Sequence, residues 1–141
     1  MARLRHIALR VTDAEASKSF YELLGFKFLG YRGDDRSVDL SDGELNMTLI
    51  PHPGERPRLE EGEEYIHFGL VVEDAQDTWR RLKDAGARIL RDDVKARNPV
   101  GGSDAPAGSF KVEDPTGNVI DISDDAREWN WAADAAVRTA R

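Results

Sequence analysis

The stretch "RHIALRVTDA", residues 5–14, decides the fold, because a similar stretch, "HFGLVVEDA", returns at residues 67–75. The chain has three histidines, and two of them, His6 and His67, stand at the same point of these stretches. The offset of 61 residues (67 minus 6) also relates Leu9, Val11, Asp13, Ala14, Gly25 and Leu29 to Leu70, Val72, Asp74, Ala75, Gly86 and Leu90. A repeat of this length in a short chain indicates a duplicated supersecondary unit.

Each repeat begins with alternating residues, the pattern of a strand that buries one face. The apolar face carries Ile7, Leu9 and Val11 in the first repeat and Phe68, Leu70 and Val72 in the second. His6, Ala8 and Arg10 share the opposite face of the first strand, and Tyr65, His67 and Gly69 share that of the second. Both histidines therefore lie on the face opposite the strongly apolar one.

A helix signal follows each strand. The sequence "TDAE" (12–15) predicts a capping box, and Asp74 is a suitable cap for the second helix. Gly25 and Gly86 suit the left-handed position that ends a helix. Each helix should cover the apolar face of its own sheet. Further strands are predicted near 26–32, 36–41 and 44–50 in the first repeat, and near 87–93, 107–113 and 117–123 in the second.

These patterns predict an α+β fold in which residues 1–141 form a single domain. The first module spans about 1–50, a linker follows at 51–64, and the second module spans about 65–123. A terminal helix is predicted at about 124–138, with an apolar stripe of Trp129, Ala132, Ala133, Ala136 and Val137. That helix either docks on its own chain or contributes to a dimer.

Composition restricts the partners. The net charge of −7 disfavours binding to nucleic acid, since an acidic surface repels phosphates. No apolar run approaches the ~20 residues of a membrane span, and the start "MARLRHIALR" has no continuous apolar stretch, so we expect a cytoplasmic protein. The absence of cysteine excludes disulfides and thiolate metal sites and fits a reducing compartment.

A carboxylate is predicted to join the two histidines. In "DPTGNVIDIS" (114–123), Asp121 lies on the strand face opposite Ile120 and Ile122. If the isoleucines meet the helix, Asp121 points to the same side as the histidines. Two imidazoles and one carboxylate make a divalent-metal site with open positions, for which zinc, iron, manganese, cobalt and nickel are all candidates.

The structural alternative is that these histidines are hydrogen-bonded core or surface residues, which is the commoner role of a single histidine in a strand. Their equivalent positions in the repeat and the carboxylate on a matching face favour the metal site. His52 lies between two prolines in the linker and is interpreted as a loop residue.

The stretches "RHIALRVTDAEASKSFYELLGF" (5–26), "YIHFGLVVEDAQDTWRRLKDAGARI" (65–89) and "DPTGNVIDI" (114–122) resemble the vicinal oxygen chelate superfamily, also called the glyoxalase/bleomycin-resistance/dioxygenase family. The resemblance covers nearly the whole chain except the linker and the terminal helix. It implies two tandem βαβββ modules with curled mixed sheets that enclose a cleft. In metal-using members the cleft holds a divalent cation, which vicinal oxygens of the substrate or intermediate chelate.

The resemblance also implies site residues. His6 and His67 match the histidine ligands of the two modules, and Asp121 stands where the family usually has glutamate. Thr48 is the nearest match for the remaining ligand, commonly glutamate or glutamine. Aspartate is one methylene shorter, and threonine offers only a neutral hydroxyl. The pattern of two histidines and two glutamates that marks glyoxalase I is therefore not met.

The first functional hypothesis is a metal-dependent enzyme acting on a small oxygenated metabolite, with lyase/isomerase or ring-cleaving dioxygenase chemistry through an enolate-like intermediate. A lyase or isomerase needs a general base, for which Glu44 and Asp121 are the candidates. Arg10, Tyr65 and Thr48 are the candidate substrate-binding residues. The resemblance also implies a homodimer, whose clefts lie within one chain or across two.

The second hypothesis is a protein that binds a drug or metabolite without turnover, as the bleomycin-resistance branch does. His6, His67 and Asp121 argue against it, Thr48 argues weakly for it, and the acidic charge is compatible with a cationic ligand. A fosfomycin-modifying enzyme is the third possibility, although such enzymes have a glutamate where this chain has Asp121.

Overall fold

The computed structural model describes residues 2–55, 63–93, 98–99 and 108–125. Module one contains β1 (His6–Val11), α1 (Ala14–Leu23), β2 (Lys27–Arg32), β3 (Ser37–Ser41) and β4 (Asn46–Pro51). Module two contains β5 (Phe68–Val71), α2 (Ala75–Asp84), β6 (Ile89–Asp93), β7 (Asn98–Pro99), β8 (Ser109–Glu113) and β9 (Val119–Ser123). The predicted βαβββ order is thus present twice, with the short β7 as an addition that the sequence did not predict.

Residues next to each helix in the sequence determine where the helix begins and ends. The side chain of Asp13 accepts a hydrogen bond from the Ala16 amide, and that of Asp74 accepts one from the Asp77 amide, so each aspartate caps its helix. The predicted capping box is wrong by one residue, because Asp13 rather than Thr12 is the cap. The helices end as predicted, with Gly25 and Gly86 at positive φ.

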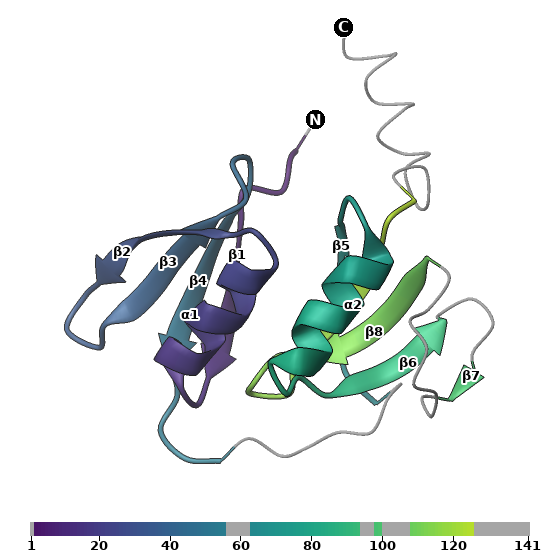
Figure 1. Ribbon diagram of the computed structural model, residues 1–141. Helices are drawn as coiled ribbons and strands as arrows, with labels where there is room; N and C mark the ends of the chain where they lie inside the picture. Colours follow the sequence, from purple (N-terminus) through teal and green to yellow (C-terminus); the bar gives the residue numbers. More distant parts are fainter. Residues whose placement is uncertain (1, 56–62, 94–97, 100–107, 126–141) are drawn as a thin grey trace, which may run out of the picture.

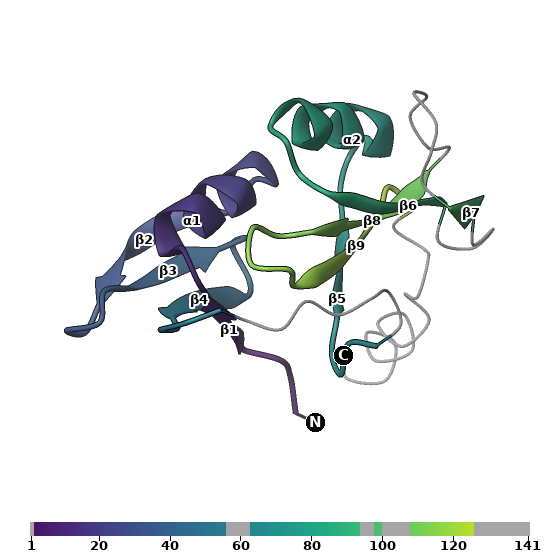
Figure 2. The ribbon, with the colours of Figure 1, turned by 90° about the horizontal axis from the view of Figure 1, so that it is seen from below.

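Each module folds into an open sheet. The strand order is β1-β4-β3-β2 in module one and β5-β9-β8-β6-β7 in module two. In both sheets the first strand pairs in parallel with the last long strand, β1 with β4 and β5 with β9. The two helices lie on the same side of the two sheets, and each covers its own sheet (Figures 1 and 2). The opposite faces, which we call the open faces, carry both histidine positions.

The core lies between the helices and the sheets and is continuous across the modules. Its fully buried strand residues include Val38, Leu40, Met47 and Leu49 from module one and Phe110, Val112, Ile120 and Ile122 from module two. These are the residues that strand alternation assigns to the helix side. Burial of this apolar surface is the main stabilising term of the fold.

The modules are joined through Tyr21 of α1, which is fully buried. Its hydroxyl donates a 2.8 Å hydrogen bond to Oδ2 of Asp114, in the turn between β8 and β9, and its ring stacks on Phe68 at a centroid distance of 6.5 Å. The Thr12 amide donates to the Thr116 hydroxyl at 3.0 Å. Figure 2 shows this turn pointing from module two toward α1. The turn of the "DPTGN" motif therefore docks one module on the other.

Gly25, which follows α1, allows a test of how much a glycine at positive φ stabilises the end of a helix. Its φ is +96°, and a Cβ built there meets no atom within 4 Å, so a side chain would suffer backbone strain and no clash. We expect Gly25→Ala to lower the free energy of unfolding by about 1–2 kcal/mol in urea denaturation. Gly69→Ala is the matched control, because Gly69 has no positive φ and its added Cβ would make ordinary contacts at 3.6 Å. Equal stability of the two variants would contradict this account.

The predicted α+β fold with two βαβββ modules is confirmed, and its two sheets remain open at their edges. Residues 126–138 of the predicted terminal helix and linker residues 56–62 lie outside the described residues, and residues 124 and 125 are not helical. Pro51, predicted as the start of the linker, belongs to β4. Among the described residues, no helix has the length and apolar character needed to cross a membrane.

Candidate functional site

Module two brings two of the predicted metal ligands together. His67 directly precedes β5, and Asp121 lies in β9, whose register pairs it with Gly69. The Nε2 atom of His67 is 3.9 Å from Oδ2 of Asp121. Two ligands of one zinc ion, each about 2.1 Å from it, lie about 3.0–3.4 Å apart. A shift of about half an ångström would therefore let both atoms reach a common cation.

The other ring nitrogen of His67 also meets a carboxylate. Its Nδ1 atom is 3.2 Å from Oε1 of Glu64, whose side chain is only 7% exposed. The two ring nitrogens point away from each other, so Glu64 and Asp121 approach the imidazole from opposite sides. Glu64 is not predicted from the sequence, because the composition of residues 51–64 indicates a linker. Its spacing of three residues from His67 was the only signal.

Module one carries the remaining predicted ligands on its own open face. His6 starts β1 and is exposed, and it pairs in register with Asn46. Thr48 lies two residues beyond Asn46 on the same face of β4, where it pairs in register with Ala8 of β1 and Asp39 of β3. The Thr48 hydroxyl donates a 2.8 Å hydrogen bond to Oδ1 of Asp39. The fourth ligand position thus holds a hydroxyl that is already engaged.

Asp39 was not predicted as part of the site. Besides the Thr48 hydroxyl, it accepts from Arg32, whose Nε and Nη2 atoms both lie 2.9 Å from its Oδ2. The open face of module one therefore has a carboxylate, supplied by β3 and not by β4. Because Arg32 neutralises this carboxylate, Asp39 is a weak candidate for a metal ligand in this arrangement.

The predicted ligands do not all meet in one chain. Among the described residues, no group of three or more histidine, aspartate and glutamate side chains is arranged to hold a metal ion. His67 and Asp121 lie on module two, whereas His6 and Thr48 lie on module one. We call these two pairs the half-sites. Glu44, a candidate base, is exposed in the turn between β3 and β4, where its amide donates to the Asp42 side chain.

The predicted substrate residues Arg10 and Tyr65 line a common pocket of about 470 Å³ at the junction of the modules. His52, interpreted from the sequence as a loop residue, lines the same pocket. Its other walls are formed by Ala8, Leu9, Ile66, Phe68, Asn118 and Val119. Thr48 is not among the lining residues.

In the described part of the chain, no hydrogen bond or ion pair engages the side chains of Arg10, His52 or Tyr65. Among the described residues that line this pocket none is acidic, although the chain carries a net charge of −7.

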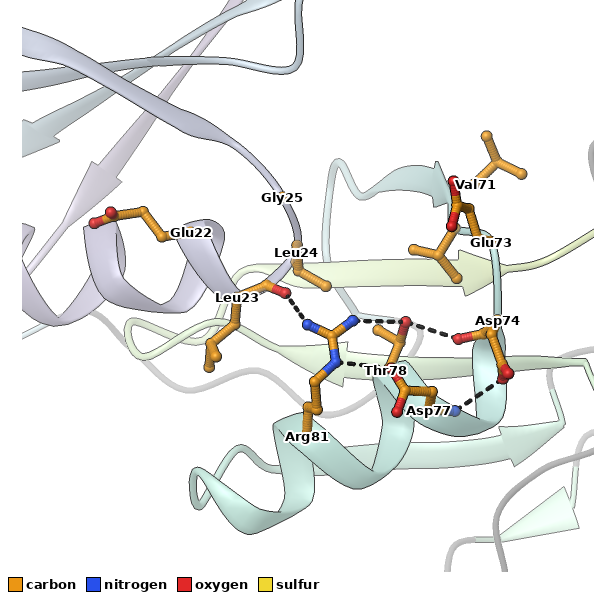
Figure 3. A pocket seen from close by; sticks show the side chains of 11 residues that line it. Glu22, Leu23, Leu24, Gly25, Val71, Glu73, Asp74, Asp77, Thr78 and Arg81 are labelled. Carbon is orange, nitrogen blue, oxygen red and sulfur yellow. Dashed lines mark hydrogen bonds and ion pairs between the residues drawn. The ribbon is translucent and has the colours of Figure 1, made fainter.

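A second cleft, of about 450 Å³, lies between the end of α1 and the start of α2 (Figure 3). Two of its charged side chains, Arg81 and Asp77, pair with each other. Arg81 donates to the Leu23 carbonyl at 2.7 Å and pairs with Asp77 at 3.0 Å, while Asp74 caps α2. Arg81 thereby ties α2 to the end of α1. This cleft is a structural joint between the modules, and the pocket around Arg10 is the better candidate for a ligand.

Lys111 is a further residue that the sequence analysis missed. It lies in β8 directly opposite Asp121, and only 7% of it is exposed. Opposed residues of an antiparallel pair share a face, so Lys111 belongs to the open face beside His67 and Asp121. Alternation along "SFKVE" would have placed it there, but a lysine in a strand is ordinarily interpreted as solvent-exposed.

The first strands of both modules present free sheet edges with exposed apolar side chains. β1 and β5 are edge strands, and neither has a second strand partner among the described residues. Near these edges Leu4 is 73% exposed, Tyr65 100%, Ile66 82% and Val71 62%. Exposed edges with large apolar side chains are typical of surfaces that pair with another chain.

Residues 3–122 match the family model described as "Glyoxalase/Bleomycin resistance protein/Dioxygenase superfamily". A lactoylglutathione lyase of Neisseria meningitidis serogroup A is 28% identical over 104 residues, which cover 64% of this chain and 71% of that protein. Among solved structures, glyoxalase I of Leishmania major has a TM-score of 0.66 at 22% identity and covers 99% of both chains. The fosfomycin resistance protein FosX of Listeria monocytogenes has a TM-score of 0.67 at 16% identity, with 92% of this chain and 96% of that chain covered. The two structures show similarity of fold alone.

Proposed function

Because the chain belongs to the glyoxalase/bleomycin resistance protein/dioxygenase superfamily, we propose that it is a divalent-metal-dependent lyase or isomerase acting on a small oxygenated metabolite. The observation that carries this proposal is the 3.9 Å approach of His67 Nε2 to Asp121 Oδ2 on an open sheet face. The sequence similarity to a lactoylglutathione lyase favours lyase chemistry over ring-cleaving oxygenation. Thr48 and Asp121 stand where family enzymes commonly have glutamate or glutamine. Because of these two differences, the substrate is left to be identified.

The complete site is proposed to form between two copies of the chain. One copy would contribute His67 and Asp121, and the other would contribute His6. Each half-site is too small to hold a divalent ion, which in catalytic centres takes about three protein ligands. The exposed apolar side chains beside β1 and β5 favour the pairing of these edges in a homodimer, since most soluble oligomers are symmetric dimers. The donor set of two imidazoles and a carboxylate then fits zinc, nickel, cobalt, manganese or iron.

When bound, a divalent cation would supply Lewis-acid stabilisation of negative charge on the substrate oxygens. The chain's own residues would do the rest. Arg10 and His52 would hold an anionic group of the substrate, because the described residues of their pocket include no carboxylate to compete for it. The phenol of Tyr65 would donate a hydrogen bond, and the apolar wall would exclude water. The base that removes a proton would be a ligand carboxylate or Glu44.

Metal content tests the proposal. We expect untagged wild-type protein to hold about one divalent ion per chain by elemental analysis. His67→Ala and Asp121→Ala should each lose most of it, because one of three protein ligands is removed. His52→Ala is the matched control: it removes an imidazole from the neighbouring pocket and should leave the metal content unchanged. Absence of metal from the wild type after reloading with each candidate ion would contradict the proposal.

The second candidate is a protein that binds its ligand without turnover. The observation that favours it is Thr48, a neutral hydroxyl already donated to Asp39 at the position where family enzymes commonly place a ligand. In this case the pocket around Arg10 would bind an organic anion in metal-free protein. Calorimetry with a panel of aromatic and aliphatic carboxylates, run on metal-free and on metal-loaded protein, distinguishes the two, since the enzyme hypothesis requires the cation for tight binding of the substrate oxygens and the binder hypothesis does not.

A further inference from the structure

We infer that Lys111 is the counter-ion of Asp121 in metal-free protein, and that its charge lowers the affinity of this half-site for a divalent cation. The inference rests on the proposed metal site and deepens it, because it assigns a role in metal binding to a residue outside the ligand set. Two observations carry it: Lys111 lies directly opposite Asp121 in the sheet, and only 7% of Lys111 is exposed.

The register of β8 on β9 determines how far apart the two side chains begin. Lys111 and Asp121 are partners in an antiparallel ladder (Figure 2). Their neighbours along the two strands are fully buried in the core beneath the helices: Phe110, Val112, Ile120 and Ile122. Because side chains alternate along a strand, Lys111 and Asp121 lie together on the open face. Directly opposite residues have Cβ atoms about 4.5–5.5 Å apart, a distance that a lysine side chain spans easily.

The burial of Lys111 requires an anion beside it. An ammonium group withdrawn from water is costly unless a counter-ion compensates for the lost hydration. The sheet places two carboxylates next to Lys111: Asp121 opposite it, and Glu113 two residues along β8 on the same face. Glu113 is paired with Arg88, whose Nη1 atom lies 3.0 Å from its Oε1 atom. Asp121 is therefore the carboxylate that we assign to Lys111.

The carboxylate of Asp121 is also a proposed metal ligand, so Lys111 and a divalent cation would compete for it. A cation bound at Asp121 would lie close to the ammonium group of Lys111, and the two positive charges would repel each other. A unit charge about 6 Å from a divalent ion lowers its affinity about tenfold even at the dielectric constant of water. Removal of the Lys111 charge should therefore strengthen metal binding, whereas loss of a residue that merely supports the site would weaken it.

Calorimetry with zinc or nickel as the titrant tests this competition in untagged protein that has been freed of metal. Lys111→Met nearly keeps the length of the side chain and removes its charge, so it should bind the metal about tenfold more tightly than the wild type. Lys111→Arg keeps the charge and should bind like the wild type. Lys27→Met is the matched control, because it removes a lysine charge from an exposed position of β2 in the other module. Should Lys111→Met fail to fold, Lys111→Gln removes the same charge and keeps a hydrogen-bond donor.

A double-mutant cycle in metal-free protein tests the pairing itself. Lys111→Met and Asp121→Asn should each raise the equilibrium constant of unfolding in urea, because each leaves a charge without its counter-ion. The double variant should be more stable than the product of the two effects predicts, with a coupling of about tenfold in that constant. The cycle of Lys111→Met with Glu113→Gln is the comparison, and its coupling should be smaller because Arg88 holds Glu113.

The two measurements separate this inference from the proposed function. Absence of coupling between Lys111 and Asp121 overturns the inference. So does a Lys111→Met variant that binds metal no more tightly than a wild type that binds it. Coupling in a protein that takes up neither zinc nor nickel, as wild type or as Lys111→Met, would refute the proposed function and leave Lys111 as the counter-ion of Asp121. Metal binding by Lys111→Met and not by the wild type would support the inference and refute the metal dependence of the wild type.

Discussion

Replacement of Asp114 by alanine is expected to lower the free energy of unfolding by about 3–4 kcal/mol, the largest effect of any single substitution proposed for this chain. Asp114 is 3% exposed. Its Oδ1 atom accepts from the amides of Thr116 and Asn118, both at 2.9 Å, and its Oδ2 accepts from Tyr21 Oη and Asn118 Nδ2, both at 2.8 Å. Alanine would leave all four donors without this acceptor, and two of them belong to the buried side chains of Tyr21 and Asn118.

Urea denaturation measures the effect, and two variants separate its parts. Tyr21→Phe removes only the hydrogen bond from α1 to Asp114 and should cost about 1 kcal/mol. The double variant should be less destabilised than the sum of the two single variants, since both remove the same bond. Asp42→Ala is the matched control: Asp42 accepts the Glu44 and Leu45 amides in the equivalent turn of module one, but it is exposed. A loss at Asp42 as large as that at Asp114 would refute the importance of the buried contacts.

Mixing two inactive variants should restore metal binding if each site is shared between chains. Homodimers of His6→Ala or of His67→Ala lack a ligand in both sites and should hold little metal. A heterodimer of the two has one site with both substitutions and one site with neither. Random exchange of subunits makes about half of the dimers mixed, so the mixture should regain about a quarter of the wild-type metal content.

The measurement is elemental analysis after joint refolding or co-expression of the two variants. The control mixes His67→Ala with Asp121→Ala, both on the same half-site, where every combination leaves each site without one ligand. Recovery in the first mixture but not in the second establishes sites built from both chains. Failure of the first mixture, in protein whose wild type holds metal and forms dimers, would place each complete site within a single chain.

Much of the architecture could be predicted from the sequence, because strand alternation and helix caps are local. The face of Asp121 followed from Ile120 and Ile122, and its approach to His67 agrees with that assignment. Whether His6 joins His67 and Asp121 in one site could not be derived in the same way. Alternation fixes the face on which a side chain lies, but it does not fix how one sheet is placed against another.

Other features escaped because they depend on tertiary contacts. The burial of Tyr21 depends on Phe68 and Asp114, which are far away in sequence. Glu64 lies in a segment whose glycine, proline and charge content indicates a linker. Lys111 is buried by the arrangement of the sheet, against the usual preference of lysine for solvent.

The docking of the "DPTGN" turn on α1 also determines how far the duplication can extend. A contact made by one surface of a repeated unit with a different surface of the next can propagate head to tail without limit. Module one has the corresponding turn, with Asp42 in place of Asp114, but the residue of α2 that corresponds to Tyr21 is Leu82 (21 plus 61). Leucine has no hydroxyl to donate, and Leu82 is buried in its own core. The contact therefore occurs once per chain, and the pair of modules is closed to the addition of a third by the same contact.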